Sequence, residues 1–270
     1  MACGGGEQTA GLAPNAPPSP PGAPSPPPPG ALVVSAQVIR MTGGSGTAVV
    51  SSGVPLPPGA LFPSGLGDVR VVVNGVEQAI YVEGLSGLHA DGSLRSVLIQ
   101  FPYNVGGAPV AAQVEVGAPR GTTDLAKTAV TWDMPEAALL PSSPAYLVTT
   151  DLVGPTRPTA QSTGIFATAD QYFETWGDWN WNTYQGAWAT SNYYDRVWNH
   201  YGYWVRSTNV TYWQRATVVA INYRRNYLEA GNYGSSPRWA QLEGLAVHYW
   251  LTGDERSKTA VISGSIVSRS

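Results

Sequence analysis

The chain has 270 residues, enough for one large or two modest domains with a hydrophobic core. Only 12% of the residues are charged and the net charge is −3, so the sequence lacks the basic surface that nucleic-acid binding requires. It also lacks an apolar run as long as a transmembrane helix. The aromatic composition is unusual: 10 Trp and 14 Tyr stand beside 4 Phe, and most of the Trp and Tyr lie between residues 170 and 250.

Residues 1–30 are rich in proline and carry a single charge, Glu7. This composition predicts an extended, disordered tether. Ala2 and Cys3 resemble the end of a bacterial lipoprotein signal, in which the cysteine receives the lipid, but the charged and apolar parts of a signal peptide do not precede them. Two interpretations stay open, a lipidated Cys3 that tethers the protein to a membrane and a tail cysteine without a role. The first predicts an extracytoplasmic protein, secreted or lipid-anchored at the cell surface.

Residues 31–150 consist of short β-branched runs separated by turn residues, which predict an all-β barrel or sandwich. The predicted strands are 32–40, 46–52, 69–74, 77–83, 93–101, 110–116 and 127–132. Asn74 and Gly75 predict a type I′ hairpin turn, because both tolerate a positive φ. The residues expected to form the core face of the strand 93–101 are Arg95, Val97, Ile99 and Phe101.

The rest of the chain is predicted to be helical. After a connection at 151–190, apolar residues recur with helical period in the segment 191–270. Helices are expected over 192–206, 210–230 and 238–251, and a fourth from Asp254, whose carboxylate can cap the first turn. Short links between them predict stacked helical hairpins. Within the connection, residues 176–184 combine Trp with Gly and Asn and are predicted to form an aromatic loop.

Particular stretches in both halves resemble a known family. The stretch 53–59 (GVPLPPG), the strand 69–73 (VRVVV) and the turn 91–95 (DGSLR) are similar to the N-terminal β domain of exo-rhamnogalacturonan lyases and YetA-like proteins. The segment 242–255 (LEGLAVHYWLTGDE) is similar to a hairpin of (α/α) toroid enzymes. The resemblance implies an α+β multidomain protein, in which a RIFT-type barrel precedes an (α/α) toroid. Since a toroid needs more hairpins than this chain holds, the chain is expected to be the first part of a longer protein.

The family resemblance implies a polysaccharide lyase that cleaves a uronate-containing, pectin-like polysaccharide by β-elimination. This reaction needs a group that neutralises the carboxylate, a base for the adjacent C–H bond and an acid for the leaving oxygen. Arginine suits the first role because its fork binds a carboxylate in two places, and His or Tyr suits the others. The candidate catalytic residues are Arg225, His248, Tyr223 and Tyr194.

Aromatic rings offer flat apolar faces to sugars, so the rings of the predicted loop are candidate substrate-binding groups, together with two arginines. They are Trp176, Trp179, Trp181, Tyr184, Arg196 and Arg238. Structural interpretations stand beside these roles: rings can pack between hairpins, Arg224 and Arg225 can pair with Glu229, and His248 can be a hydrogen-bonded core residue. No metal-ligand spacing is recognised, and neither a metal nor a cofactor is expected.

Two other functions fit the same residues. A non-catalytic glycan-binding or surface-attachment module would use the aromatic loop alone. A glycoside hydrolase would use paired carboxylates, for which Asp178, Asp195 and Glu243 are candidates. In all three cases the partner is a polysaccharide.

Overall fold

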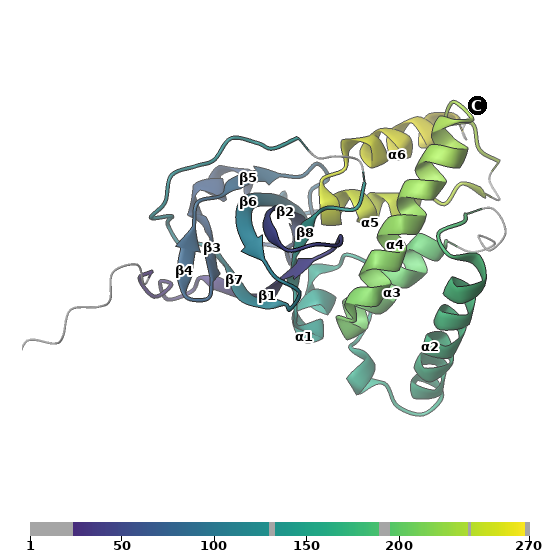
Figure 1. Ribbon diagram of the computed structural model, residues 1–270, viewed down its shortest axis with the longest axis horizontal. Coiled ribbons are helices and arrows are strands. Elements are labelled where there is room, and N and C mark those ends of the chain that lie inside the picture. The colour runs from purple at the N-terminus through teal and green to yellow at the C-terminus, as the bar shows by residue number, and fades with distance from the viewer. Residues whose placement is uncertain (1–23, 130–132, 189–194, 237–238, 268–270) are drawn as a thin grey trace, which may run out of the picture.

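The computed structural model describes residues 24–129, 133–188, 195–236 and 239–267. It is a mixed α+β structure, in which one curled sheet carries helices on one side (Figure 1). The strands are β1 (Leu32–Arg40), β2 (Gly46–Pro55), β3 (Val69–Val73), β4 (Val76–Gln78), β5 (Tyr81–Gly84), β6 (Ser96–Val105), β7 (Val110–Val116) and β8 (Ala137–Pro141).

The eight strands follow the order β4-β3-β7-β1-β8-β2-β6-β5 and curl into a half-barrel. All neighbouring strands are antiparallel except β2 and β8, which are parallel. The longest pairing joins β2 to β6, from Gly46 opposite Val105 to Pro55 opposite Ser96. The β half is therefore one curled sheet and not the two packed sheets of a sandwich.

Most of the predicted strands are confirmed. Asn74 and Gly75 have φ values of +49° and +77° and join β3 to β4 as the expected tight hairpin. The predicted strand 77–83 divides into β4 and β5, and the prediction of a strand at 127–132 is wrong for residues 127–129, which are irregular. Residues 130–132 lie outside the described residues. Strand β8 was not predicted, because its sequence AALLP has no β-branched residue.

The sheet is buried on both faces where helices cover it. Val97, Ile99 and Phe101 of β6 face the interior of the half-barrel, as predicted. The alternate residue Leu98 is also buried, because it packs against Tyr249 and Trp250 of the helical part. Arg95 is half-buried, with its guanidinium carbon 5.3 Å from the centre of the Trp250 ring.

The helical part contains the four helices predicted over 192–270. The helices of the structure are α1 (Pro144–Leu147), α2 (Ile165–Tyr184), α3 (Arg196–Ser207), α4 (Val210–Tyr223), the π-helical turn η4 (Arg224–Glu229), α5 (Leu242–Thr252) and α6 (Glu255–Val267). Short 3-10 turns lie in the connections: η1 (Pro63–Asp68), η2 (Val148–Thr150) and η3 (Thr159–Gln161). Side chains cap four of the helices, since Ser143, Asp195, Asn209 and Asp254 each accept a hydrogen bond from a backbone amide of the following turn. Rings of α3 and α4 fill the space between the helices, as the helical spacing predicts.

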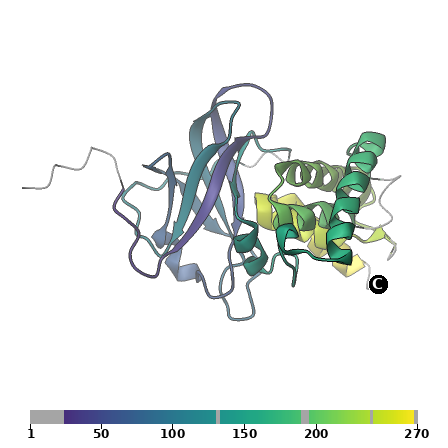
Figure 2. The same ribbon diagram turned by 90° about the horizontal axis from the view of Figure 1, so that it is seen from below.

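The prediction of an aromatic loop at 176–184 is wrong, because these residues form the second half of α2. Gly and Asn are weak helix formers, so the local sequence argues against a helix here. Tertiary contacts overcome this weakness: Arg206 of α3 binds Asp170, and Arg215 of α4 binds Asp178. In both views α2 lies at the end of the molecule away from the sheet (Figures 1 and 2).

Part of the predicted proline-rich tether lies against the sheet. Arg70 of β3 is buried and binds Glu115 of β7 at 2.6 Å, and it also donates to the backbone carbonyl of Ser25. Residues 1–23, with Cys3, lie outside the described residues. Among the helices that the structure describes, none is long and apolar enough to cross a membrane.

Candidate functional site

A cavity of about 150 Å³ lies between the sheet and the end of helix α5. Its lining combines buried polar groups with apolar surface, as ligand sites commonly do. The polar lining residues are Ser51 and Gln100 on the sheet, Thr128, Asp133 and Glu136 on the segment before β8, and His248, Thr252 and Asp254 at the end of α5.

The end of α5 brings His248 and Asp254 to the cavity together. Gly253 follows the helix with φ +71°, a left-handed conformation that ends the helix and reverses the chain. The hydroxyl of Thr252 donates to the carbonyl of His248 at 2.6 Å and accepts from the amide of Asp254 at 3.2 Å. This turn fixes the Asp254 carboxylate beside the imidazole.

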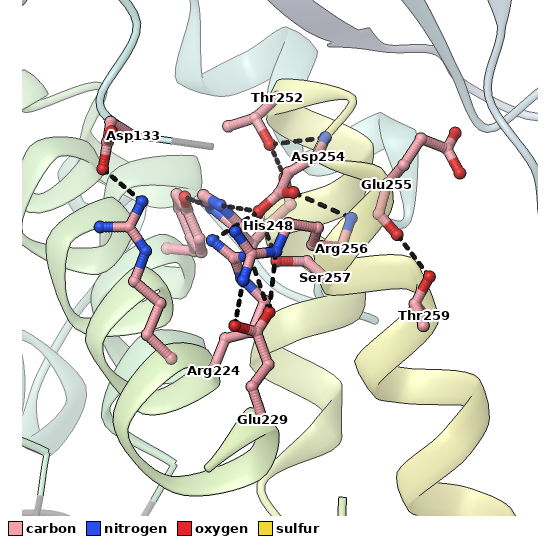
Figure 3. A network of polar contacts seen from close by, with 12 residues as sticks. Asp133, Arg224, Glu229, His248, Thr252, Asp254, Glu255, Arg256, Ser257 and Thr259 are labelled. Atoms are coloured by element: carbon pink, nitrogen blue, oxygen red, sulfur yellow. Dashed lines mark hydrogen bonds and ion pairs between the residues drawn. The ribbon is translucent and has the colours of Figure 1, made fainter. Parts of the chain in front are cut away.

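Both nitrogens of the His248 ring contact polar groups (Figure 3). Nδ1 lies 2.8 Å from the hydroxyl of Tyr201, which is fully buried and also contacts the Thr217 hydroxyl at 2.9 Å. Nε2 lies 3.4 Å from Oδ2 of Asp254. The imidazole is therefore held in one orientation while it lines the cavity.

Asp254 is the most heavily bonded carboxylate of the site. It accepts from the Ser257 hydroxyl at 2.8 Å and from the Arg256 amide at 3.0 Å, and Arg224 lies 3.4 Å away. Burial alone would raise the pKa of Asp254, but the hydrogen bonds with His248 and Ser257 and the positive charge of Arg224 outweigh it and lower the pKa to about 2. Asp254 is thus a fixed negative charge beside His248.

Two consecutive arginines of the π-helical turn η4, Arg224 and Arg225, bind different partners. Arg224 is fully buried and binds Glu229 at 3.1 Å in addition to Asp254, and Arg256 also binds Glu229 (Figure 3). Arg225 instead binds Asp133 at 2.6 Å, at the edge of the cavity. The predicted pairing with Glu229 is therefore confirmed for Arg224, and Arg225 pairs with Asp133. Such π-helical turns are frequent at functional sites.

The other described candidates for catalysis and substrate binding lie away from this cavity. Tyr223 is buried against Trp188, and its hydroxyl donates to the carbonyl of Trp239 and accepts from the Gln241 amide at 3.1 Å. Arg196 is buried and donates to the carbonyls of residues 185 and 187, so it holds the end of α2 to α3. Burial and the nearby charge of Arg215 lower the pKa of Arg196 to about 10.

The rings predicted to bind substrate are all on α2, in different environments. Trp181 lies between Arg196 and Arg215, at 5.8 and 5.5 Å from their guanidinium carbons, and is half-buried. Trp176 packs on Phe173 with ring centres 5.7 Å apart. Trp179 is 55% exposed, and Tyr184 lies edge-on to it at 5.9 Å. Of the four, Trp179 therefore presents the largest free ring.

The remaining predicted residues either lie outside the described ranges or have other partners. Tyr194 and Arg238 fall outside the described residues, as does Cys3. Among the carboxylates considered for hydrolysis, Asp178 binds Arg215, Asp195 accepts from the amides of Trp198 and Gly244, and Glu243 is exposed.

Asp133, Glu136, Gln100 and Tyr201 were not predicted as site residues. Sequence offers little signal for the first three, because they come from the sheet and a loop that only the fold brings to α5. Tyr201 lies within the segment 191–270 that is predicted to be helical, and it packs in the core of the helical part, but its spacing does not reveal its contact with His248.

Within the residues that the structure describes, no group of three His, Cys, Asp or Glu side chains is placed to hold a metal ion. Comparisons with protein-family models, curated proteins and solved structures find no match to the chain.

Proposed function

We propose that the protein is carbohydrate-active, that it binds a uronate-containing polysaccharide at the cavity beside His248, and that it cleaves this polymer by β-elimination. The observation that carries the proposal is the ion pair between Arg225 and Asp133, in which a cation holds a carboxylate at the edge of the cavity that His248 lines. Arg225 is 38% exposed, so a carboxylate of a ligand can reach it. With Arg225 at the edge of the cavity and His248 in its lining, a uronate carboxylate could bind the arginine while the sugar lies next to the imidazole as the proton-transfer group.

In the proposed reaction, the uronate carboxylate replaces Asp133 on Arg225, which neutralises the charge and acidifies the adjacent C–H bond. Nε2 of His248 takes that proton: in the neutral ring Nδ1 donates to the Tyr201 oxygen, the Tyr201 hydroxyl donates to Thr217, and the Asp254 carboxylate stabilises the imidazolium that forms. The electron pair of the C–H bond forms the new C=C bond as the C–O bond to the leaving sugar breaks, and the leaving oxygen takes a proton from water. Tyr201 and Asp254 act as positioning residues, because they hold the two ring nitrogens.

The family resemblance supplies the substrate class. A curled β sheet followed by stacked helical hairpins is compatible with a RIFT-type barrel that precedes the beginning of an (α/α) toroid, in the order that the motifs at 53–59, 91–95 and 242–255 imply. The proline-rich segment and Cys3 support an extracytoplasmic location, with lipidation of Cys3 as part of the same proposal.

A second candidate function is non-catalytic glycan binding. It is favoured by the partners on both nitrogens of His248, which are what a structural histidine would have, and by the modest cavity of about 150 Å³. A site of this size accommodates one sugar unit without requiring chemistry.

The test is incubation of the protein with polygalacturonate and with rhamnogalacturonan, followed by ultraviolet absorbance of the unsaturated product. We expect absorbance to rise, His248→Ala to abolish it, and Arg225→Gln to raise KM. Arg120→Gln is the matched control, since Arg120 pairs with Asp124 in the β part and away from the cavity. New reducing ends without absorbance would indicate a hydrolase, and retained binding without either product would indicate the glycan-binding function.

A further inference from the structure

A second cleft lies between helices α2 and α3, and it is separate from the cavity beside His248. Its volume is about 350 Å³, at the lower end of the range of small-molecule sites. Its lining comes from the connection before η3, the first half of α2 and one side of α3. None of the described residues lines both sites. The cleft therefore has to be explained on its own.

Gly202 forms part of the cleft wall at a position where the fold does not require a glycine. It lies in the middle of α3, where glycine favours the helix less than any residue except proline. A Cβ added at this position would meet no atom within 4 Å, so packing leaves room for a side chain. The effect of the glycine is thus to keep the cleft open, as glycines do where a ligand approaches the backbone closely.

Three rings supply apolar walls. Phe173 of α2 and Tyr203 of α3 stack with ring centres 4.7 Å apart. The third ring is the half-buried Trp198, which lies four residues before Gly202 and so on the same side of α3. A flat apolar ring therefore stands beside the position that glycine leaves unfilled.

The two charged residues of the lining, Asp170 and Arg206, neutralise each other. Arg206 donates to both carboxylate oxygens of Asp170 at 2.6 and 2.8 Å, to the Ser162 hydroxyl at 3.1 Å and to the Arg157 carbonyl at 2.9 Å, which uses four of its five N–H groups. The two side chains are 12 and 22% exposed, so a charged ligand would have to break a largely buried pair. The lining therefore favours an uncharged ligand.

The cleft also offers hydrogen-bonding groups that the described residues do not use. The side chains of Thr156 and Asn199 are half-buried in its lining and have no hydrogen-bond partner within the part of the chain that the structure describes. The carboxylate oxygens of Asp170 can each accept a further hydrogen bond beside the one from Arg206. A ligand that carries several hydroxyl groups would satisfy all three residues.

We propose that the cleft between α2 and α3 binds one uncharged sugar unit. The C–H face of the sugar lies on the ring of Trp198 beside Gly202, and the sugar hydroxyls bind Asp170, Asn199 and Thr156. An uncharged aromatic molecule would fit the same apolar walls, but it would leave these polar groups without partners in a partly buried site. The lining alone carries this choice of ligand, which does not depend on cleavage at His248.

The experiment is saturation-transfer NMR titration of the whole chain with D-galactose, L-rhamnose, D-galacturonate and phenol as separate probes. We expect at least one of the two neutral sugars to bind. Gly202→Leu should abolish this binding, because the leucine side chain would occupy the cleft. Asn199→Ala should weaken it about tenfold. Gly106→Leu is the matched control, since a Cβ at Gly106 in the β part also meets nothing within 4 Å.

Thermal unfolding separates lost binding from lost folding. Gly202→Leu should unfold at the same temperature as wild type or a higher one, because leucine favours a helix more than glycine does. The inference is overturned if neither neutral sugar binds, if Gly202→Leu binds the sugar as well as wild type does, or if this variant loses phenol binding instead.

Galacturonate keeps this inference distinct from the proposed function. Its binding should weaken in Arg225→Gln and stay unchanged in Gly202→Leu, because the two residues belong to different sites. Galacturonate binding that Gly202→Leu abolishes would show that the cleft takes a charged sugar, against the inference. Neutral-sugar binding that Gly202→Leu abolishes supports the inference whatever happens at His248.

Discussion

The carboxylate of Asp195 joins the first turns of two helices. Its Oδ1 accepts from the amide of Trp198 in α3, and its Oδ2 accepts from the amide of Gly244 in α5, both at 2.8 Å. Asp195 comes directly before α3, whereas Gly244 follows it by 49 residues. One side chain therefore sets the position of α5 relative to α3.

Gly244→Ala should destabilise the protein by about 3 kcal/mol, because the new Cβ would lie 2.5 Å from Oδ1 of Asp195 and 2.7 Å from Cβ of Val197. Urea unfolding monitored by circular dichroism measures the change. Gly202→Ala in α3 is the control: its Cβ would meet nothing within 4 Å, so it should raise stability by about 0.5 to 1 kcal/mol. Equal effects of the two substitutions would contradict the close packing at Gly244.

The free energy of unfolding should fall between about pH 4 and pH 6 because of Asp195. Burial is the largest influence on this carboxyl and raises its pKa from 3.8 to about 6. In this range the folded state binds the Asp195 proton more tightly than the unfolded state does. The protonated carboxyl therefore adds its full contribution to the free energy of unfolding below pH 3.8, and this contribution is lost as the pH rises through 6. The loss amounts to about 3 kcal/mol. Urea titrations at several pH values should show this slope in wild type and its removal in Asp195→Asn.

Arg206→Ala should loosen α2 before it unfolds the rest of the protein. The substitution leaves the buried Asp170 without its two hydrogen bonds, at a cost of about 2 kcal/mol after allowance for partial exposure. Hydrogen exchange should accelerate in the peptide 165–184 and stay unchanged in β2 and β6. Lys127→Ala breaks the exposed pair with Glu83 and should cost less than about 1 kcal/mol. Global acceleration of exchange would show that α2 does not open separately.

Gly53→Ala should separate α5 from the sheet. Gly53 lies on β2 at the point where the backbone of Trp250 touches the strand, and an added Cβ would overlap the Trp250 carbonyl oxygen. The carbonyl also accepts from the Ser96 hydroxyl at 2.6 Å, so it has little freedom to move. We expect a loss of about 3 kcal/mol. Gly106→Ala, where a Cβ meets nothing within 4 Å, is the control, and thermal unfolding compares the two.

Local sequence was sufficient to predict those strands and helices whose residue types favour the secondary structure that they adopt. Strand β3 is a run of valines with Arg70 among them, β1 and β7 contain several β-branched residues each, and α3 and α4 have Asp195 and Asn209 as caps. Helix α2 was missed because contacts with Arg206 and Arg215 stabilise it, and those arginines are distant in sequence. Tertiary contacts thus overrode local propensity.

The candidate site was predictable only in part. His248 and Arg225 were found by residue type, and the cap at Asp254 by its position before a helix. The relation between them was not predictable, because Asp133 reaches Arg225 from a loop before β8 and Tyr201 reaches His248 from α3. A pattern read along the chain carries no information on such contacts between distant segments.

Burial of β6 on both faces removes the usual means by which a strand selects its register. A slip by one residue would still place apolar side chains on both sides, since Leu98 and Ile99 would only exchange environments. Two polar residues prevent this exchange. Ser96 donates to the Trp250 carbonyl, and Gln100 exchanges hydrogen bonds with both backbone groups of Thr128 at 3.0 Å. A shifted strand would bury both side chains inside the half-barrel without partners, so hydrogen bonding, and not hydrophobic pattern, makes the alignment of β6 unique.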